Sequence, residues 1–87
     1  MTTAAASELE SIVAAKVVDA RGAACPGPLL EAKKGMGVVP VGSVIEIWSS
    51  DPVTKTDIAA WSGKVGHTFL GFIEAIGYDR VFVRREK

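Results

Sequence analysis

Residues 16–36 read KVVDARGAACPGPLLEAKKGM, and these residues are the most informative about the fold. Its first part, 16–20, is short and carries paired β-branched side chains, which is typical of a strand that ends before Arg21. Pro26 and Pro28 then stand at the head of a helical pattern. Proline is favoured there because the amides of a first helical turn have no intrahelical acceptor to lose. The stretch therefore predicts a strand, a loop and a helix.

The helix in this stretch has one apolar face. Leu29, Ala32 and Met36 recur at i, i+3 and i+7, the spacing of one side of an α-helix. Gly35 and Gly37 lower helix stability and favour termination at this point. We therefore expect a short helix whose apolar face packs against a sheet.

The rest of the chain repeats the alternation of strand and helix. The predicted ranges are a strand over 43–48, a helix over 54–64, a strand over 67–76, a hairpin connection over 77–80 and a strand over 81–85. Asp51 before Pro52 favours a helix start at which Asp51 is the cap. Ile58, Trp61 and Val65 share one helix face, so we interpret Trp61 as a core residue. The order β-α-β-α-β-β predicts an α/β (α+β) two-layer sandwich, with two helices on one face of a small mixed four-stranded sheet.

Composition limits the function classes that the chain can belong to. The 87 residues suffice for one small domain, and 10 basic residues balance 10 acidic ones. Zero net charge argues against a nucleic-acid binder, although Arg80, Arg84, Arg85 and Lys87 form a basic end. A single cysteine excludes a disulfide framework and a cysteine-cluster metal site, and we expect no metal.

Residues 1–15 lack the features of a targeting segment. They contain two acidic residues and no basic residue, whereas signal and transit peptides carry positive charge. We expect a flexible tail or a short helix here, followed by the domain over 16–87. Because no apolar run approaches about 18 residues, we expect a cytoplasmic protein without membrane insertion.

Cys25 is the residue that most directly indicates a function. A lone cysteine is often a small buried hydrophobe, but this one directly precedes a predicted helix N-terminus. The helix dipole there stabilises a thiolate, so we expect a thiol pKa below about 8.5. The small neighbours Gly22–Ala24 leave the sulfur accessible. No second cysteine can resolve a mixed disulfide, and nothing couples His67 to Cys25 as a base. The thiol is thus suited to accept, hold and pass on a group.

The sequence resembles the TusA family of small sulfur carrier proteins, also called SirA-like. The residues Cys25-Pro26-Gly27-Pro28 fit the family's Cys-Pro-x-Pro motif. The other matching segments are Asp19-Ala20-Arg21-Gly22, Lys33-Lys34, Pro40-x-Gly42, and Ser50-Asp51-Pro52 with Asp57-Ile58 and Trp61. The resemblance covers about residues 16–85. Two departures stand out: Ser50 replaces the first acid of a D-D-P segment, and the glycines at 35 and 37 shorten the first helix.

The resemblance implies that Cys25 carries sulfane sulfur, as a persulfide or a thiosulfonate, between partner proteins. It implies service in tRNA thiolation, cofactor sulfur supply or sulfur oxidation. The implied partners are sulfur-donor and sulfur-acceptor proteins, among them rhodaneses, cysteine desulfurases, and DsrE-like or heterodisulfide-reductase-like proteins. The protein would then be a relay component with a covalent cysteine intermediate rather than a free-standing enzyme. It would be monomeric when working and need no cofactor beyond the carried sulfur.

Residue roles follow as expectations. Cys25 is the acceptor nucleophile, while Pro26, Gly27 and Pro28 shape its loop and the helix entry. Candidates for contact with an anion or a partner are Arg21, Lys33 and Lys34, which are otherwise ordinary solvated charges. Asp19 either orients the loop or faces solvent at the strand end.

Two other functions use the same fold. One is a non-covalent regulatory or interaction module that does not use the thiol, and the other is an accessory that passes thiosulfate-derived sulfur inward during transport. Replacing Cys25 with serine separates the module from the carriers, because only a carrier loses transfer.

Overall fold

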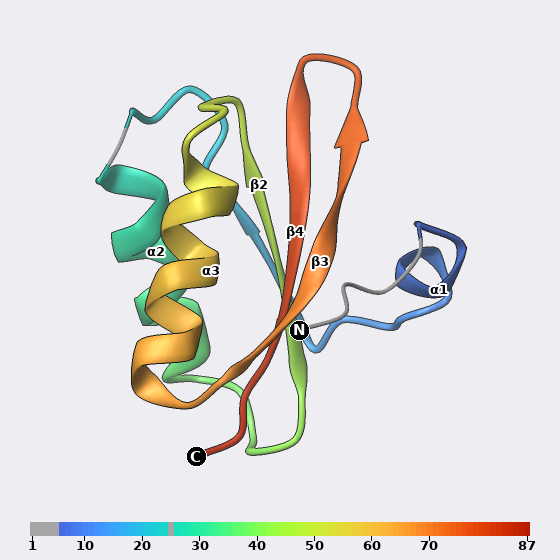
Figure 1. Cartoon of the computed structure of the whole chain (residues 1–87), viewed down its shortest axis with the longest axis vertical. Helices are drawn as coiled ribbons and strands as arrows, with labels where there is room; N and C mark the ends of the chain where they lie inside the picture. Colours follow the sequence, from blue (N-terminus) through green and yellow to red (C-terminus); the bar gives the residue numbers. More distant parts are fainter. Residues whose placement is uncertain (1–5, 25) are drawn as a thin grey trace.

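The computed structural model describes residues 6–24 and 26–87 (Figure 1). The elements, in chain order, are α1 (Ala6–Glu10), β1 (Lys16–Asp19), α2 (Gly27–Met36), β2 (Val44–Ser49), α3 (Thr54–Val65), β3 (Thr68–Ala75) and β4 (Tyr78–Arg84). The predicted order of strands and helices is confirmed from β1 onward, and α1 adds a short helix before it. No helix in the described part of the chain is long and apolar enough to span a membrane.

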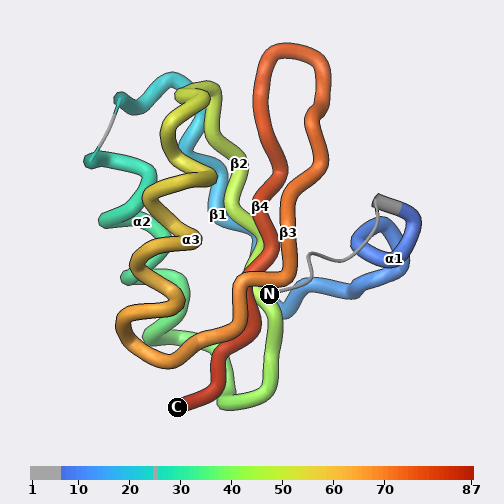
Figure 2. The backbone as a smooth tube through the Cα atoms, in the orientation of Figure 1, coloured from blue at the N-terminus to red at the C-terminus, as the bar shows by residue number. Residues whose placement is uncertain are grey.

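The four strands form one mixed sheet in the order β1-β2-β4-β3. β1 and β2 run parallel, and the other two neighbouring pairs are antiparallel. The parallel pair requires a crossover, which α2 supplies. Helices α2 and α3 cover one face of the sheet, and α1 lies on the opposite side (Figures 1 and 2). The predicted two-layer sandwich is therefore confirmed.

The main core fills the space between the sheet and the two longer helices. Its buried members are Val18, Ala32, Met36, Val39, Ile45, Ile47, Ile58, Val81 and Val83, with Leu29, Trp61, Phe69 and Phe72 packed against them. The predicted apolar face of the first helix and the core position of Trp61 are thus confirmed. Strand residues of this set alternate along the chain because successive side chains of a strand point to opposite faces.

Gly35 lets α2 approach the sheet closely. A Cβ atom at this position would lie 2.7 Å from Val18 Cγ2, well inside van der Waals contact. Gly35 is buried, and the helix continues one residue beyond it, to Met36, with Gly37 at the C-cap. The glycines do end the helix here, and Gly35 also serves the packing of helix against strand.

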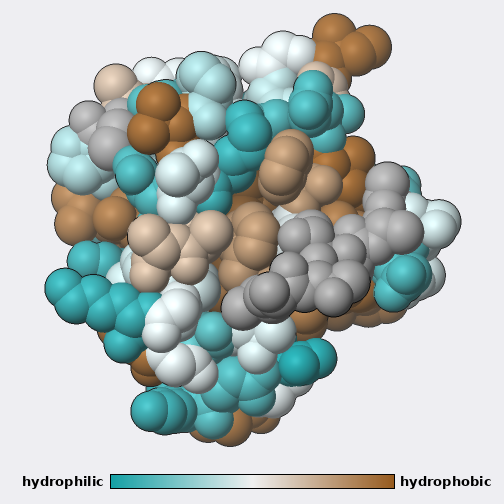
Figure 3. Space-filling view, viewed as in Figure 1, coloured by the Kyte–Doolittle hydropathy of each residue, from teal (hydrophilic) through white to brown (hydrophobic). Residues whose placement is uncertain are grey.

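The β3–β4 hairpin differs from the prediction. The connection is only Ile76-Gly77, and Tyr78 already belongs to β4. Gly77 has a φ of 84°, a left-handed conformation that glycine adopts without strain, so two residues suffice to reverse the chain. Ile76 is fully exposed in the connection at the end of this hairpin. The hairpin projects beyond helices α2 and α3 (Figure 1), and hydrophobic atoms protrude at the same end of the space-filling view (Figure 3).

The second face of the sheet carries polar and aromatic groups. Glu46 is buried there and accepts hydrogen bonds from Trp48 Nε1 and from Arg80 Nε, the latter at 2.8 Å. Arg80 also pairs with Glu10 of α1, whose neighbour Leu9 is fully buried. Helix α1 thus covers part of this face, and Glu10 and Leu9 are among the side chains that attach it.

Candidate functional site

Cys25, the predicted acceptor of sulfur, lies outside the described residues, so the site is characterised by what flanks it. The preceding loop, residues 20–24, connects β1 to α2. Pro26 occupies the N-cap position of α2, and Gly27 and Pro28 open the helix. The cysteine therefore stands, by chain connectivity, between a short loop and the N-terminus of a ten-residue helix.

Backbone hydrogen bonds give this loop a defined path. Ala20 N–H donates to Trp48 O of β2 at 2.8 Å, and Ala23 N–H donates to Ala20 O at 3.2 Å. Ahead of the helix, Gly27 N–H donates to Ala24 O at 2.8 Å. Gly22, with a φ of 85°, takes a left-handed conformation within this path. Both ends of the loop are consequently fixed by the backbone itself.

The middle of the loop is attached to a second segment through a side chain. Gly22 N–H donates to Ser50 Oγ at 2.9 Å. Ser50 follows the last residue of β2, so this bond joins two segments that are 28 residues apart in sequence. The tube in Figure 2 shows these two segments together at one end of the sheet.

The segment around Ser50 is itself held by its neighbours. Ser49 Oγ bonds Thr54 Oγ1 at 2.7 Å and accepts Asp51 N–H at 3.1 Å. Both Ser49 and Thr54 are buried. The turn from which Ser50 extends is therefore anchored in the core on both sides.

The predicted role of Asp51 as the helix cap needs correction. Helix α3 begins at Thr54, its N-cap residue is Val53, and no side chain caps it. Asp51 Oδ1 instead accepts Val53 N–H at 3.0 Å, in the turn that precedes the helix. Pro52 sits inside this turn, which displaces the start of regular helix by two residues and leaves Asp51 too early to be the N-cap.

Arg21, predicted as a contact for an anion or a partner, is engaged within the protein. Its guanidinium bonds both carboxylate oxygens of Asp19, at 2.9 and 2.8 Å. It also lies over the Trp48 ring at 4.7 Å and the Tyr78 ring at 5.0 Å. The two rings contact each other at 5.5 Å between centroids. Arg21 thus joins the start of the cysteine loop to an aromatic platform made by β2 and β4.

This ion pair shifts the titration of both partners. Hydrogen bonds from the Arg21 side chain, then from its backbone N–H, lower the pKa of Asp19 below its usual value. The hydrogen bond to Asp19 raises the pKa of the Arg21 guanidinium. Of the two roles open for Asp19, the geometry favours the one that orients the loop, because the carboxylate fixes Arg21 directly.

Lys33 and Lys34 lie apart from the loop. Both belong to the last turn of α2, and Lys33 stands six residues after Gly27, which is about 9 Å along the helix axis. Lys34 is largely exposed and pairs with Glu31 at 3.4 Å. Lys33 lines a groove with Trp61 between α2 and α3. The two lysines thus belong to the helical face rather than to the immediate surroundings of the loop.

His67 is also remote from the cysteine loop. It follows the C-terminus of α3, a 12-residue helix about 18 Å long whose other end adjoins the Ser50 segment. His67 Nδ1 accepts Glu86 N–H at 3.1 Å, and its ring packs edge-on against Trp61. These contacts give His67 a structural role at the opposite end of the domain.

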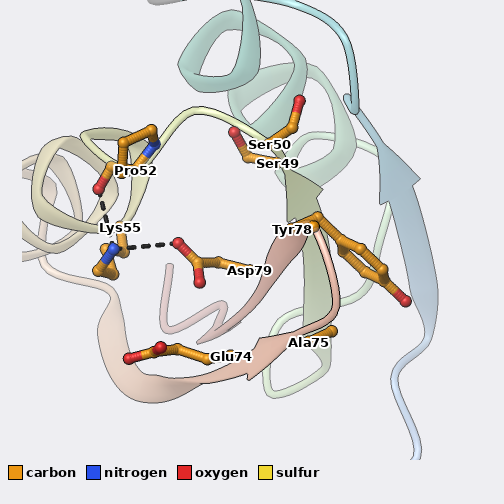
Figure 4. A pocket seen from close by; sticks show the side chains of 9 residues that line it. Ser49, Ser50, Pro52, Lys55, Glu74, Ala75, Tyr78 and Asp79 are labelled. Carbon is orange, nitrogen blue, oxygen red and sulfur yellow. Dashed lines mark hydrogen bonds and ion pairs between the residues drawn. The ribbon is translucent and has the colours of Figure 1, made fainter.

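Two hollows meet at Ser50. The smaller, of about 260 Å³, is lined by Gly22, Ala23, Ala24, Ser50 and Asp51. The larger, of about 330 Å³, lies between the start of α3 and the β3–β4 hairpin (Figure 4). In it, Lys55 Nζ bonds Asp79 Oδ2 and Pro52 O, each at 3.0 Å, whereas Tyr78 points away from the hollow (Figure 4). The loop that carries Cys25 therefore borders an open, small-residue surface.

Sequence reasoning missed three contributors to this site. It noted Ser50 only as a departure from a family pattern, and it gave no role to Trp48 or Tyr78 beside the loop. Their roles depend on the pairing of β2 with β4, which sets Trp48 opposite Arg80 and Ser49 opposite Asp79. No local sequence pattern signals these contacts, because they join residues that are far apart in the chain.

Comparison with known proteins identifies relatives over nearly the whole domain. The family described as sulfurtransferase TusA matches residues 16–85. A protein of Archaeoglobus fulgidus described as a candidate sulfur carrier protein is 44% identical over 71 residues, covering 82% of this chain and 97% of the relative. Sulfur carrier protein TusA of Pseudomonas entomophila is 30% identical over 69 residues, covering 79% and 86%.

A solved structure shares the fold. The crystal structure of a SirA-like protein from Desulfitobacterium hafniense superposes with a TM-score of 0.72, covering 83% of this chain and 99% of that one. At 19% sequence identity, the similarity concerns the fold alone.

Proposed function

The chain belongs to the TusA family, and from this premise we propose that it is a sulfur carrier that holds sulfane sulfur on Cys25 and passes it between proteins. The observation that carries the proposal is the place of the chain's single cysteine within the family match, directly before the N-terminus of α2. Relatives covered over most of their length are named as sulfur carriers.

The transfer step needs only a nucleophilic thiolate on the carrier. The Cys25 thiolate attacks the terminal sulfur of a donor persulfide, a new S–S bond forms at Sγ, and the donor's S–S bond breaks. The donor leaves as a thiolate, and the carrier holds a persulfide with the same proton count. With tetrathionate, the thiolate takes an S–SO₃⁻ group and thiosulfate leaves. Neither exchange requires an external oxidant, because the moved sulfur keeps its oxidation state.

The surroundings of the loop suit such a thiolate. The dipole of α2 favours negative charge at its N-terminus, and Pro26 and Pro28 stiffen the entry to this helix. The side chains that flank the loop are small, so a partner's sulfur can approach. No described histidine adjoins the loop, in keeping with a group that is held and exchanged rather than hydrolysed.

Protein donors and acceptors complete the proposal. A carried persulfide must be loaded and unloaded by exchange with other thiols, so the partners present cysteines of their own. We place the protein in sulfur relay for tRNA thiolation, cofactor supply or sulfur oxidation, with a cysteine desulfurase or a rhodanese as the class of donor. Recognition rests on local contacts, because zero net charge gives little long-range steering.

The decisive experiment is intact-mass measurement of the protein after incubation with polysulfide and, separately, with tetrathionate. Each sample is measured with and without reductant, beside Cys25→Ser as the matched control. We expect a reductant-labile adduct of one sulfur atom, or of the S–SO₃⁻ group, on the wild type only. The reagent that loads the thiol distinguishes a persulfide carrier from a thiosulfonate carrier.

Two outcomes overturn the carrier proposal. If neither reagent loads the wild type although iodoacetamide alkylates Cys25, the non-covalent interaction module becomes the better description. If iodoacetamide also fails on the folded protein but succeeds in denaturant, Cys25 is a buried structural residue.

A further inference from the structure

Ser50 provides the side-chain bond that joins the middle of the cysteine loop to another segment. Among the hydrogen bonds of the described residues, those at the ends of the loop are made by backbone groups, at Ala20 and Gly27. Between these ends, Gly22 N–H reaches Ser50 Oγ at 2.9 Å. Gly22 is three residues before Cys25, so this bond acts on the loop close to the thiol in sequence.

Ser50 lies in a turn that its neighbours hold in place. Ser49 and Thr54, on either side of Ser50, are fully or almost fully buried and bonded to each other at 2.7 Å. Asp51 N–H donates to Ser49 Oγ, and Asp51 Oδ1 accepts Val53 N–H. Because this turn is fixed at the end of β2, the hydrogen bond from Gly22 to Ser50 holds the loop in place relative to β2.

The hydroxyl is also neutral, at a place where charge would matter. Ser50 borders the same small hollow as Ala23 and Ala24, the last described residues before the cysteine. Among the described residues, no cationic side chain lines that hollow, and Arg21 is already paired with Asp19. A carboxylate at position 50 would accept the Gly22 amide equally well, but it would add a negative charge next to Asp51.

We propose that Ser50 is a positioning residue for sulfur transfer, whose neutral hydroxyl fixes at Gly22 the loop that presents Cys25 and leaves the adjoining hollow open to anionic sulfur donors. This assignment rests on the proposed function. Ser50 touches neither the sulfur nor a donor in this assignment; it acts through the backbone of the loop. Since the side chain is exposed, its replacement should leave the fold intact.

The test compares Ser50→Ala, Ser50→Thr and Ser50→Asp with the wild type, and uses Ser11→Ala as a matched control. Ser11 is likewise an exposed serine with a hydrogen-bonded hydroxyl, but it lies beyond α1. Three quantities are measured: hydrogen exchange of the Gly22 amide by NMR, the rate of alkylation by neutral iodoacetamide across pH, and the rate of loading by the tetrathionate dianion. Thermal melting verifies that each variant is folded.

For Ser50→Ala we expect the Gly22 amide to exchange faster and tetrathionate to load more slowly. Each rate should change by a factor on the order of five, in keeping with the loss of one neutral hydrogen bond. Ser50→Thr restores wild-type values. Ser50→Asp keeps Gly22 protected and alkylation near the wild-type rate once the thiol is ionised, yet slows loading by the dianion.

The proposal is overturned if Ser50→Ala exchanges Gly22 and loads tetrathionate within twofold of the wild type. It is equally overturned if Ser50→Asp loads the dianion as fast as the wild type. Failure of the underlying function looks different: the wild type then does not load at all, while Gly22 exchange and alkylation still report whether Ser50 fixes the loop.

Discussion

The two faces of the sheet are built on different principles. On the face covered by α2 and α3, apolar side chains such as Ile45, Ile47 and Val83 interlock with the helices. On the opposite face, Glu46 is buried beneath Arg80, and the five-residue helix α1 supplies the cover. One face is held by apolar packing along two long helices. The other combines specific polar pairs with a smaller apolar contribution, in which Phe82 of β4 and Leu9 of α1 are fully buried.

Stability and the positioning of the cysteine loop depend on different faces of the sheet. Apolar burial is non-directional and accounts for most of the folding free energy, so the helical face determines whether the domain folds. Directional pairs determine where particular atoms lie, and the polar face extends through Trp48 and Arg21 to the start of the cysteine loop. We therefore expect the domain to stay folded after substitutions on the second face that change the position of the cysteine loop.

The largest effect on stability is expected when a buried side chain is removed from the helical face. Ile47 is fully buried between the sheet and the helices. We expect Ile47→Ala to lower the free energy of unfolding by about 2–5 kcal/mol, because it loses apolar burial and leaves a cavity that the surroundings cannot fill. Urea denaturation followed by circular dichroism measures the loss.

Leu9→Ala is the matched control on the opposite face. Leu9 is also fully buried, but it belongs to a five-residue helix at the start of the described chain. We expect a much smaller loss than for Ile47→Ala, since α1 can detach locally while the domain stays folded. An equal loss in both variants would show that α1 is an integral part of the fold and that the contrast between the faces is wrong.

The helical face is also the part that the sequence could predict. The i, i+3, i+7 spacing of Leu29, Ala32 and Met36 is a local pattern, and local patterns determine which side of a helix is buried. The platform under Arg21 has no such pattern, because it requires Trp48 and Tyr78 to meet across β2 and β4.

Turn geometry explains the other differences from the prediction. Asp51-Pro52 is a favourable helix start in isolation, yet here it forms a separate turn before α3 because Ser49 and Thr54 bond across it. The same applies to Ser50, whose hydroxyl gains its partner from a loop 28 residues away. Pairings of this kind follow from the completed fold rather than from any local stretch.

A smaller effect is expected from the buried carboxylate of the second face. Glu46→Ala removes the acceptor shared by Arg80 Nε and Trp48 Nε1. We expect a loss of about 1–3 kcal/mol in the free energy of unfolding, because two donors lose their partner in a buried position. The loss is limited because Arg80 retains its pair with Glu10 and is partly exposed.

Glu74→Ala provides the control for this variant, since Glu74 is an exposed carboxylate of β3 in the same sheet. Urea midpoints of the two variants are compared with the wild type. If Glu46→Ala unfolds at the midpoint of Glu74→Ala, the polar pairs contribute nothing to stability, and apolar cover by α1 alone would hold the second face.

The smallest effect is expected where the second face meets the cysteine loop, at the ion pair of Asp19 with Arg21. Both side chains are about half exposed, so solvent screens the pair and its contribution to stability is slight. Its signature is instead a titration: the hydrogen bonds from Arg21 lower the pKa of Asp19, and Arg21→Gln should return this pKa towards its usual value. Carboxyl NMR measures both values.

The sign of the pH dependence follows from that shift. A carboxyl with a lowered pKa in the folded state contributes its stability above the unfolded pKa, near 4, and loses it as the pH falls through the folded value. The stability difference between the wild type and Arg21→Gln should therefore be present at neutral pH and shrink in acid below about pH 4. A wild-type Asp19 that titrates at its usual value would show that the aromatic platform, and not the carboxylate, holds Arg21 against the start of the loop.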